Sequence, residues 1–306
     1  MADEPLGGTP LVRLEQLSPR PEVALYAKLE WHNPTGSLKD RVAAAMVEGA
    51  EREGLLRGGA HLVEPSSGNT GIALARLALL KGYRLTVTMP ANVSPERKQL
   101  LAALGAQVVE TPAAEGSNGA IGRARELAAE HGSVLLHQYE NPANPEVHYR
   151  TTGQEIVEQL GRVDALVAGL GTGGTLMGVG RALREAHPGT QVVAVEPPAG
   201  ELVTGLRSLE EGYVPPIFDP AFVDGKLLVR PREAVVMTRR LLHEEGLFAG
   251  ISSGAAVHGA VRWMERLERG TVVTILPDGG WKYLSAGVWA DPIEQVVERV
   301  SGQVYF

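Results

Sequence analysis

A lysine that could act as a catalytic amine lies within residues 33–41 (NPTGSLKDR). Lys39 follows a turn of Pro, Gly and Ser and directly precedes an alanine-rich run typical of a helix. A lysine at such a loop-to-helix junction can point into a cleft instead of into solvent. An amine that attacks a carbonyl carbon must first lose its proton, and partial burial favours the neutral form. Lys39 is therefore a candidate nucleophile or base.

A second candidate is the turn at residues 65–71 (PSSGNTG), which joins an expected strand to an expected helix. The first turn of a helix has unpaired N–H groups and a partial positive charge, which suit a carboxylate or a phosphate. Two serines, an asparagine and a threonine add side-chain donors at the same place. The same residue types also cap helices, so this turn alone does not distinguish an anion site from a helix cap.

A third candidate is the glycine-rich run at residues 169–175 (GLGTGGT), again between a strand and a helix. Its glycines let the backbone approach a ligand, and its amides with Thr172 and Thr175 could surround a phosphate. The run also matches the G-x-G-x-x-G pattern, and Glu196 ends the next strand. These two features are typical of dinucleotide-binding proteins, so a nicotinamide or flavin enzyme is an alternative.

The turn at residues 250–254 (GISSG) is a fourth candidate, with a helix cap as the alternative interpretation. The remaining lysines are Lys28 in an alternating strand, Lys81 and Lys98 on helical patterns, and Lys226 and Lys282 in loops. None of them follows a Gly/Ser turn into a helix. A phosphate loop, an unusual lysine and a hydroxyl-rich anion turn together suggest pyridoxal phosphate.

Composition excludes several other classes. The 306 residues contain no cysteine, which excludes disulfides and thiolate metal sites, and the eight histidines show no metal-ligand spacing. The net charge of −7 and the absence of a basic block argue against nucleic acid or an anionic membrane as partner. No apolar run reaches the roughly 18–20 residues that span a bilayer, and the acidic start lacks a signal sequence, so a cytoplasmic protein is expected.

Apolar strand patterns alternate with helical patterns, which is typical of a parallel α/β architecture. Strands are expected at 60–65, 83–90, 106–112, 133–139, 164–171, 190–197 and 270–277. Helices are expected at 70–82, 94–105, 117–132, 151–161, 175–189, 231–245 and from near Gly254, with irregular chain at 197–228. The Pro- and Asn-rich stretch 138–149 is expected to connect two α/β units. In such folds ligands bind beyond the carboxyl ends of the strands, where the candidate turns fall.

Seven ordered motifs together closely resemble the cysteine synthase family, the β-substituting pyridoxal-phosphate enzymes of the tryptophan-synthase-like fold. The motifs are GGTPLVRL, KLEWHNPTGSLKDR, EPSSGNTGIALA, GYRLTVTMP, QYENPANPEVHY, GLGTGGTLMGVGR and GLFAGISSGAA. The resemblance implies the fold type II architecture, with two three-layer αβα domains, mostly parallel sheets and an active site between the domains. We expect a smaller domain at 37–146 and a larger one formed by 1–36 with 147–306. Members of the family are typically homodimers.

The resemblance also implies roles for particular residues. Lys39 would form the Schiff base with the cofactor and move the α-proton of the substrate, and Asn69 would donate a hydrogen bond to the 3′-oxygen of the cofactor. Ser252 would face the pyridine nitrogen, where a neutral hydroxyl favours β-elimination. The phosphate would be held by Gly171, Thr172, Gly173, Gly174 and Thr175. The substrate carboxylate would be bound by Ser66, Ser67, Asn69, Thr70 and Gln138.

The implied reaction is β-elimination of an activated serine to an aminoacrylate, followed by addition of sulfur to give L-cysteine. Residues 205–220 and 277–287 and the terminus SGQVYF resemble the branch that uses O-phosphoserine and a thiocarboxylated sulfur carrier protein. Arg207 matches the arginine that recognises the phosphate in that branch, although it could be a solvated loop residue. O-acetylserine and free sulfide stay open as alternatives. The tail VYF either covers the mouth of the site or is a frayed end.

Three other classes of function are alternatives to this one. Cystathionine β-synthase and serine dehydratase share the cofactor chemistry, and a dinucleotide-dependent oxidoreductase would use the run at 169–174 with Glu196. A non-enzymatic sensor or scaffold would not need the lysine and the hydroxyl-rich turns. The motif PDGGW at 277–281 departs from the small-residue variants of the family, so the resemblance implies no role for Asp278.

Overall fold

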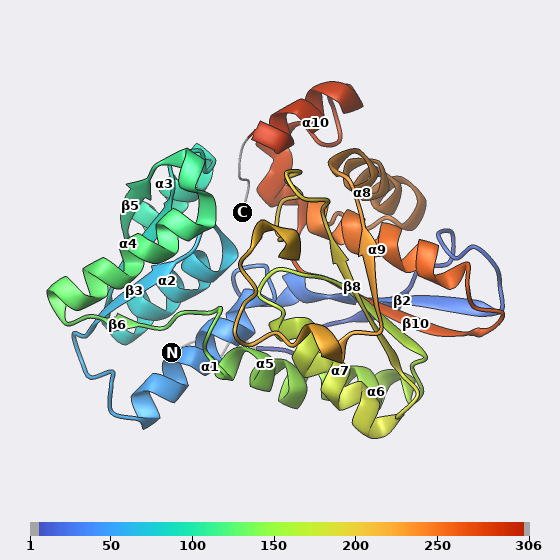
Figure 1. Cartoon of the computed structure of the whole chain (residues 1–306), viewed down its shortest axis with the longest axis horizontal. Coiled ribbons are helices and arrows are strands. Elements are labelled where there is room, and N and C mark those ends of the chain that lie inside the picture. The colour runs from blue at the N-terminus through green and yellow to red at the C-terminus, as the bar shows by residue number, and fades with distance from the viewer. Residues whose placement is uncertain (1–5, 303–306) are drawn as a thin grey trace.

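The computed structural model describes residues 6–302 and contains two sheets (Figure 1). The larger sheet has six strands in the order β1 (Leu11–Arg13), β2 (Val23–Leu29), β10 (Gly270–Leu276), β7 (Ala165–Gly169), β8 (Gln191–Glu196) and β9 (Gly225–Leu228). The smaller sheet has four, in the order β5 (Gln107–Thr111), β4 (Arg84–Pro90), β3 (His61–Pro65) and β6 (Val134–Leu135). Every pair of neighbouring strands is parallel except β1 and β2.

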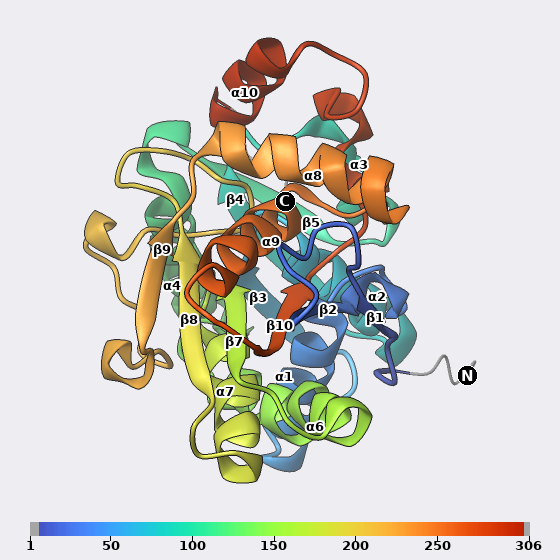
Figure 2. The ribbon, with the colours of Figure 1, turned by 90° about the vertical axis from the view of Figure 1, so that its right-hand side faces the viewer.

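Helices cover both faces of each sheet, so each half is a three-layer αβα unit (Figures 1 and 2). On the smaller sheet α4 (Gly116–His131) packs against one face, and α2 (Asn69–Lys81) with α1 (Lys39–Arg52) lies on the other. On the larger sheet α8 (Pro231–Glu245) and α9 (Ile251–Met264) lie on one face, opposite α7 (Gly174–Ala186). The remaining helices are α3 (Pro95–Ala103), α5 (Ala143–His148), α6 (Gln154–Leu160) and α10 (Ile293–Gly302).

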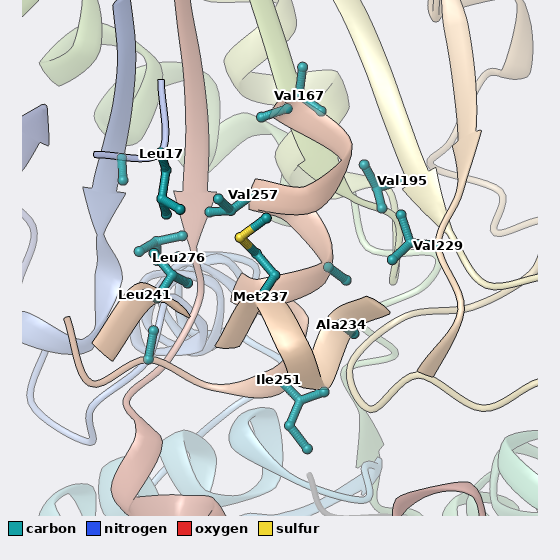
Figure 3. Close-up of a cluster of buried hydrophobic side chains, with 14 of the residues drawn as sticks. Leu17, Val167, Val195, Val229, Ala234, Met237, Leu241, Ile251, Val257 and Leu276 are labelled. Atoms are coloured by element: carbon teal, nitrogen blue, oxygen red, sulfur yellow. The ribbon is translucent and has the colours of Figure 1, made fainter. Parts of the chain in front are cut away.

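The central strands β10 and β7 of the larger sheet are mostly apolar, as expected for strands that are covered on both faces. Side chains alternate along a strand, so Val167 and Leu276 join the core beneath α8 and α9, while Leu166 packs in the separate core beneath α7. Met237 of α8 points towards Val257 of α9 within this core (Figure 3). This two-sided burial holds the carboxyl ends of β7, β8 and β10 in fixed relative positions.

Most predicted strands and helices are present, and the differences have physical causes. The strand expected at 133–139 shrinks to Val134–Leu135 because His137 adopts a left-handed backbone conformation with φ of 55°. The stretch 138–149, predicted to connect two α/β units, includes α5, which runs through a π-helical turn at Tyr149–Gly153 into α6. The helix expected near Gly254 begins earlier, at Ile251.

Further elements were missed, among them the short strand β1. The region 197–228 was expected to be irregular, yet it contributes the edge strand β9, and α10 was not predicted at all. The strands of the smaller sheet fall inside 37–146, while the domain boundaries themselves stay a prediction. The tail VYF at 304–306 lies outside the described residues. None of the described helices is both long and apolar enough to cross a membrane.

Candidate active site

The candidate turns converge on one cavity of about 890 Å³, including its mouth, between the two sheets. The smaller unit contributes the 66–70 turn after β3, together with Gln138. The larger unit contributes the glycine-rich loop after β7 and Ser252 at the start of α9. The walls therefore come from loops at the carboxyl ends of parallel strands, the place where α/β folds bind ligands.

Lys39 lines this cavity as the first residue of α1. The turn before it is fixed by the N–H of Leu38, which donates to the carbonyl of Pro277 at 2.9 Å, and by the hydroxyl of Ser37, which accepts from the N–H of Lys39 at 3.3 Å. Burial lowers the pKa of Lys39 to about 8, and the charge of Glu64 opposes part of that shift. The side chain can therefore supply a neutral amine near neutral pH, which a solvated lysine does far less well.

Glu64 is a fully buried carboxyl at the end of β3 that sequence reasoning missed. Its two oxygens accept the N–H groups of His137 at 2.8 Å and Gln138 at 3.0 Å. These bonds hold His137 in its left-handed conformation and so place Gln138 on the cavity wall. Burial raises the pKa of Glu64 to about 8. A single acidic residue inside an otherwise apolar strand, immediately before the 65–71 turn, was the signal that could have identified it.

The residues predicted to bind the substrate carboxylate lie together on the cavity wall: Ser66, Ser67, Asn69, Thr70 and Gln138. The hydroxyl of Ser66 accepts N–H bonds from Gly68 at 3.2 Å and Gly71 at 2.9 Å, so it also stabilises the start of α2. The hydroxyl of Thr70 donates to Oε1 of Gln138 at 2.7 Å. The amide nitrogen of Gln138 donates one N–H to the carbonyl of Pro65 at 3.3 Å, which leaves its second N–H as a donor.

The predicted phosphate loop forms the N-terminus of α7, with Gly171, Thr172, Gly173 and Thr175 on the cavity wall. Gly173 has φ of 85°, and a Cβ there would lie 2.6 Å from that of Phe218, so only glycine fits.

The loop is held from behind by Asn144, which donates to the hydroxyl of Thr172 at 3.0 Å. Gly174 does not line the cavity itself. A Cβ on it would lie 2.0 Å from the side-chain oxygen of Asn144, so glycine is required for this packing. The cavity side of the loop leaves helix N-terminal amides available to an anion.

Ser252 lies in the first turn of α9, is 4% exposed, and lines the cavity as a neutral hydroxyl. Asp278 also lines it and accepts hydrogen bonds from the amide of Asn69 and the hydroxyl of Tyr283, both at 2.8 Å. Lys282 donates to the side-chain oxygen of Asn69 at 2.7 Å. Burial lowers the pKa of Lys282 to about 8. The sequence predicted only a loop lysine at this position, and the structure shows a second lysine of lowered pKa.

Arg207 does not line this cavity but an adjoining hollow, which shares Ser67, Tyr139, Gly171, Gly205 and Leu206 with it. Its guanidinium carbon lies 5.3 Å from the ring centre of Tyr139 and 4.9 Å from that of Tyr213. The N–H of Arg207 donates to the carbonyl of Leu170 at 2.8 Å, which connects its backbone to the phosphate loop.

Glu196, the acid that the dinucleotide alternative required, is fully buried and occupied by other groups. It pairs with Lys226 at 2.8 Å and accepts the N–H of Leu209 at 3.1 Å. It is therefore not free to bind a ribose hydroxyl. Among the described residues, no cluster of three or more His, Cys, Asp or Glu side chains could hold a metal ion.

The donor set fits pyridoxal phosphate. The aldehyde of that cofactor needs an amine of lowered pKa, its phosphate needs backbone N–H groups, and its ring nitrogen needs a polar neighbour. Lys39, the N-terminus of α7 and Ser252 meet these needs from three sides of one cavity. The loop keeps this shape only with glycine at 173, because a Cβ there would clash with Phe218.

Comparison with known proteins agrees with this chemistry. Residues 2–278 match the model of the family described as pyridoxal-phosphate dependent enzyme. A cysteine synthase of Staphylococcus aureus (strain Mu50 / ATCC 700699) is 46% identical over 295 residues, which cover 93% of this chain and 95% of the relative. The chain therefore belongs to the pyridoxal-phosphate dependent enzymes and, within them, to the cysteine synthase family.

Solved structures of similar proteins share the fold. A crystal structure of an O-ureido-L-serine synthase has a TM-score of 0.87 and 41% identity, covering 93% of each chain. A cysteine synthase from Entamoeba histolytica has a TM-score of 0.86 and 32% identity, covering 96% of this chain and 93% of that one. The predicted family, fold class and cofactor are thus confirmed, and the dinucleotide alternative is not supported.

Proposed function

We propose that the enzyme makes L-cysteine by replacing the β-substituent of an activated serine with sulfur. The observation that carries the proposal is the position of Lys39, an amine with a pKa lowered to about 8, in one cavity with the 66–70 anion turn and the 171–175 loop. Pyridoxal phosphate, when bound, supplies the electron sink that allows an α-proton and then a β-leaving group to depart. Substrate and cofactor meet between the two sheets.

The chain's own groups hold the cofactor and move the proton. Nζ of Lys39 binds the cofactor and, once released by the substrate, accepts the α-proton. The N-terminal amides of α7 and the hydroxyls of Thr172 and Thr175 bind the phosphate. Asn69 donates to the ring oxygen. Ser252 faces the ring nitrogen and, as a neutral group, does not add a charge there.

The substrate carboxylate binds at the start of α2. The N–H groups at the start of that helix and the hydroxyl of Ser67 are donors, and Gln138, whose Oε1 accepts the O–H of Thr70, adds its amide nitrogen. A carboxylate held there presents the α-carbon to Lys39, which lines the same cavity. Loss of these donors would raise KM for the amino acid more than it lowers kcat.

O-phosphoserine is the substrate that the hollow beside the cavity favours. Arg207 is half-buried against two tyrosine rings, and no described carboxylate lies within ion-pair distance of its guanidinium. A guanidinium without a carboxylate partner is suited to a phosphate dianion through paired hydrogen bonds, whereas an acetyl ester offers no such charge. The hollow adjoins Ser67 and Gly171 of the main site, so a leaving phosphate can reach it.

The test compares Arg207→Gln with the wild type on O-phosphoserine and on O-acetylserine. We expect kcat/KM for O-phosphoserine to fall by about 10²-fold and that for O-acetylserine to change by less than about threefold. Arg181→Gln is the matched control, because Arg181 also stacks on a tyrosine but lies on the outer surface of α7. Equal losses on both substrates, or a wild type that prefers O-acetylserine, would refute the phosphoserine assignment.

The sulfur source is proposed to be the thiocarboxylate of a small carrier protein, with sulfide as the alternative. The test is cysteine formation with each donor at equal sulfur concentration. The likeness to an O-ureido-L-serine synthase favours one further assay, in which hydroxyurea replaces the sulfur donor and products are separated by mass. The homodimer and the carrier partner stay predictions, for which sedimentation velocity of the enzyme with and without carrier is the direct measurement.

A further inference from the structure

The side-chain amide of Asn69 is held from both sides by ionisable groups. Its nitrogen donates to Asp278 at 2.8 Å, and its oxygen accepts from Lys282 at 2.7 Å. A carboxylate can only accept hydrogen bonds and an ammonium can only donate them. The two partners therefore permit one orientation of the amide and exclude the flipped one. Asn69 lines the cavity, and the second N–H of its amide makes no hydrogen bond to any described residue.

Asp278 is itself held rigidly. It is 1% exposed, and the hydroxyl of Tyr283 donates to the same oxygen that binds Asn69, at 2.8 Å. Arg97 of α3, 4% exposed, lies with its guanidinium carbon 5.8 Å from the ring centre of Tyr283 and balances the buried negative charge. Buried charges are costly, and removing one partner leaves the others uncompensated. Burying these charges therefore costs folding free energy, and the cluster holds the Asn69 amide in one orientation.

The backbone carbonyls of Pro277 and Asp278 bind two other elements of the site. The carbonyl of Pro277 accepts the N–H of Leu38, immediately before Lys39, at 2.9 Å. The carbonyl of Asp278 accepts the N–H of Gly250, two residues before Ser252, at 3.0 Å. Residues 277–282 therefore contact the start of α1, the start of α2 and the start of α9. Their position at the end of β10 sets the spacing of all three.

We propose that Asp278 and Lys282 are positioning residues that lock the Asn69 amide, so that it can present only an N–H group to the ring oxygen of the cofactor. The inference rests on the cofactor contact proposed above for Asn69. Without the lock, the amide can rotate and turn its carbonyl oxygen towards the electron-rich ring oxygen, which replaces a hydrogen bond by repulsion. The pair acts through Asn69 and touches no reacting atom.

The test is the dissociation constant of pyridoxal phosphate from the cofactor-free chain, measured by quenching of tryptophan fluorescence. Asp278→Asn and Lys282→Met are each made in the wild type and in an Asn69→Ala background. We expect each single change to weaken binding by about 5- to 10-fold, the size of one hydrogen bond, and Lys282→Arg to stay within about threefold of the wild type. In the Asn69→Ala background, Asp278→Asn should change the constant by less than about twofold.

Matched controls separate positioning from a general loss of structure. Asp164→Asn changes a partly buried aspartate that accepts the N–H of Thr271 at the opposite end of β10, and it should leave cofactor binding unchanged. Thermal unfolding of each cofactor-free variant reports whether the fold is kept. For kinetics, we expect Asp278→Asn to lower kcat more than it raises KM for the amino acid, because the substrate donors Ser67 and Gln138 make no contact with Asp278.

Two results would overturn the inference in distinguishable ways. If Asp278→Asn weakens binding equally in the wild type and in the Asn69→Ala background, Asp278 does not act through Asn69, and the inference alone is wrong. If Asn69→Ala binds the cofactor as tightly as the wild type, the contact proposed for Asn69 is wrong as well. A loss in the wild type that vanishes in the Asn69→Ala background supports the lock.

Discussion

Lys28 and Lys39 are both enclosed by the protein, but they differ in whether a carboxylate lies beside the amine. Lys28, at the end of β2, is 0% exposed, and its Nζ donates to the carbonyl of Thr9 at 2.6 Å and pairs with Glu155 at 2.8 Å. Glu155 also pairs with Arg41 at 2.6 Å, and Arg41 pairs with Glu30 at 2.8 Å. Every charge of this cluster therefore meets an opposite charge.

Lys39 has no such partner among residues 6–302. No described carboxylate lies within ion-pair distance of its Nζ, and the charge of Glu64 acts on it from farther away. Burial therefore dominates and lowers the pKa of Lys39 to about 8. Burial by itself therefore does not make a lysine reactive. The absence of a close carboxylate decides whether the amine can be neutral.

The largest expected effect follows from removing the reactive amine. Lys39→Ala should lower kcat by roughly 10³-fold or more, because the group that binds the cofactor and accepts the proton is lost. The visible absorption that survives dialysis of the loaded wild type should be absent from the variant. A variant that keeps both the absorption and substantial turnover would show that another amine does the chemistry.

Disrupting the cluster of Lys28, Glu155 and Arg41 should lower the stability of the protein and leave its catalysis unchanged. Glu155→Gln leaves Lys28 and Arg41 short of one negative charge and should lower the free energy of unfolding by about 3 kcal/mol, measured by urea titration at pH 7. The visible absorption of the loaded enzyme should be unchanged. A loss below about 1 kcal/mol would mean that the cluster contributes little.

The stabilising effect of Glu155 should depend on pH. Although burial opposes ionisation, hydrogen bonds and charge from Arg41 and Lys28 lower the pKa of Glu155 from 4.5 to about 2. Its contribution is therefore fully present above pH 4.5 and is lost as the pH falls towards 2. The difference between wild type and Glu155→Gln should shrink over that window, as followed by urea titrations at successive pH values.

Replacing each lysine by methionine in the cofactor-free chain should give opposite signs. Lys39→Met removes an uncompensated charge and should stabilise the chain at pH 7 by about 1–3 kcal/mol, whereas Lys28→Met should destabilise it. The unfolded state binds the extra proton between pH 8 and 10.5, so the wild type gains stability as pH rises through that window. The difference in free energy of unfolding between Lys39→Met and the wild type should therefore disappear near pH 10.5. An unchanged difference across the window would contradict the lowered pKa.

The smallest effect is expected at an exposed pair. Lys81 lies 2.8 Å from Glu51 on the outer surface of α2, with both side chains partly exposed. Lys81→Met should change the free energy of unfolding by less than about 1 kcal/mol, and added salt should reduce the difference further. Cofactor binding and turnover should not change, which makes this variant the reference for a lysine with neither role.

Regular elements with local signals were predictable. The helix expected at 231–245 is present at Pro231–Glu245, because Pro231 starts it and Gly246, with φ of 70°, ends it. The helix α5 was missed because a stretch rich in Pro and Asn is typical of turns. Its prolines lie at the helix start, where the backbone N–H needs no partner, so they do not prevent a helix.

The turns of the site were also predictable, because glycine and hydroxyl residues at strand ends are local features. The contacts that support them were not. Asn69 and Asp278 are 209 residues apart in the chain, and Glu64 and Gln138 are 74 apart. Nothing in either short segment indicates its partner, because these hydrogen bonds exist only after two strands of one sheet, or two sheets, are side by side.

The sequence by itself determined most of the strands and helices, the position of the anion-binding turns and, through its motifs, the cofactor. Only the tertiary structure decided which lysine is held without a carboxylate, and which acid orients the amide beside it. The reason is physical: a pKa depends on the solvent and charges within a few ångströms, and those neighbours come from distant parts of the chain. Lys28, Lys39 and Lys282 have the same side chain, and only folding makes them differ.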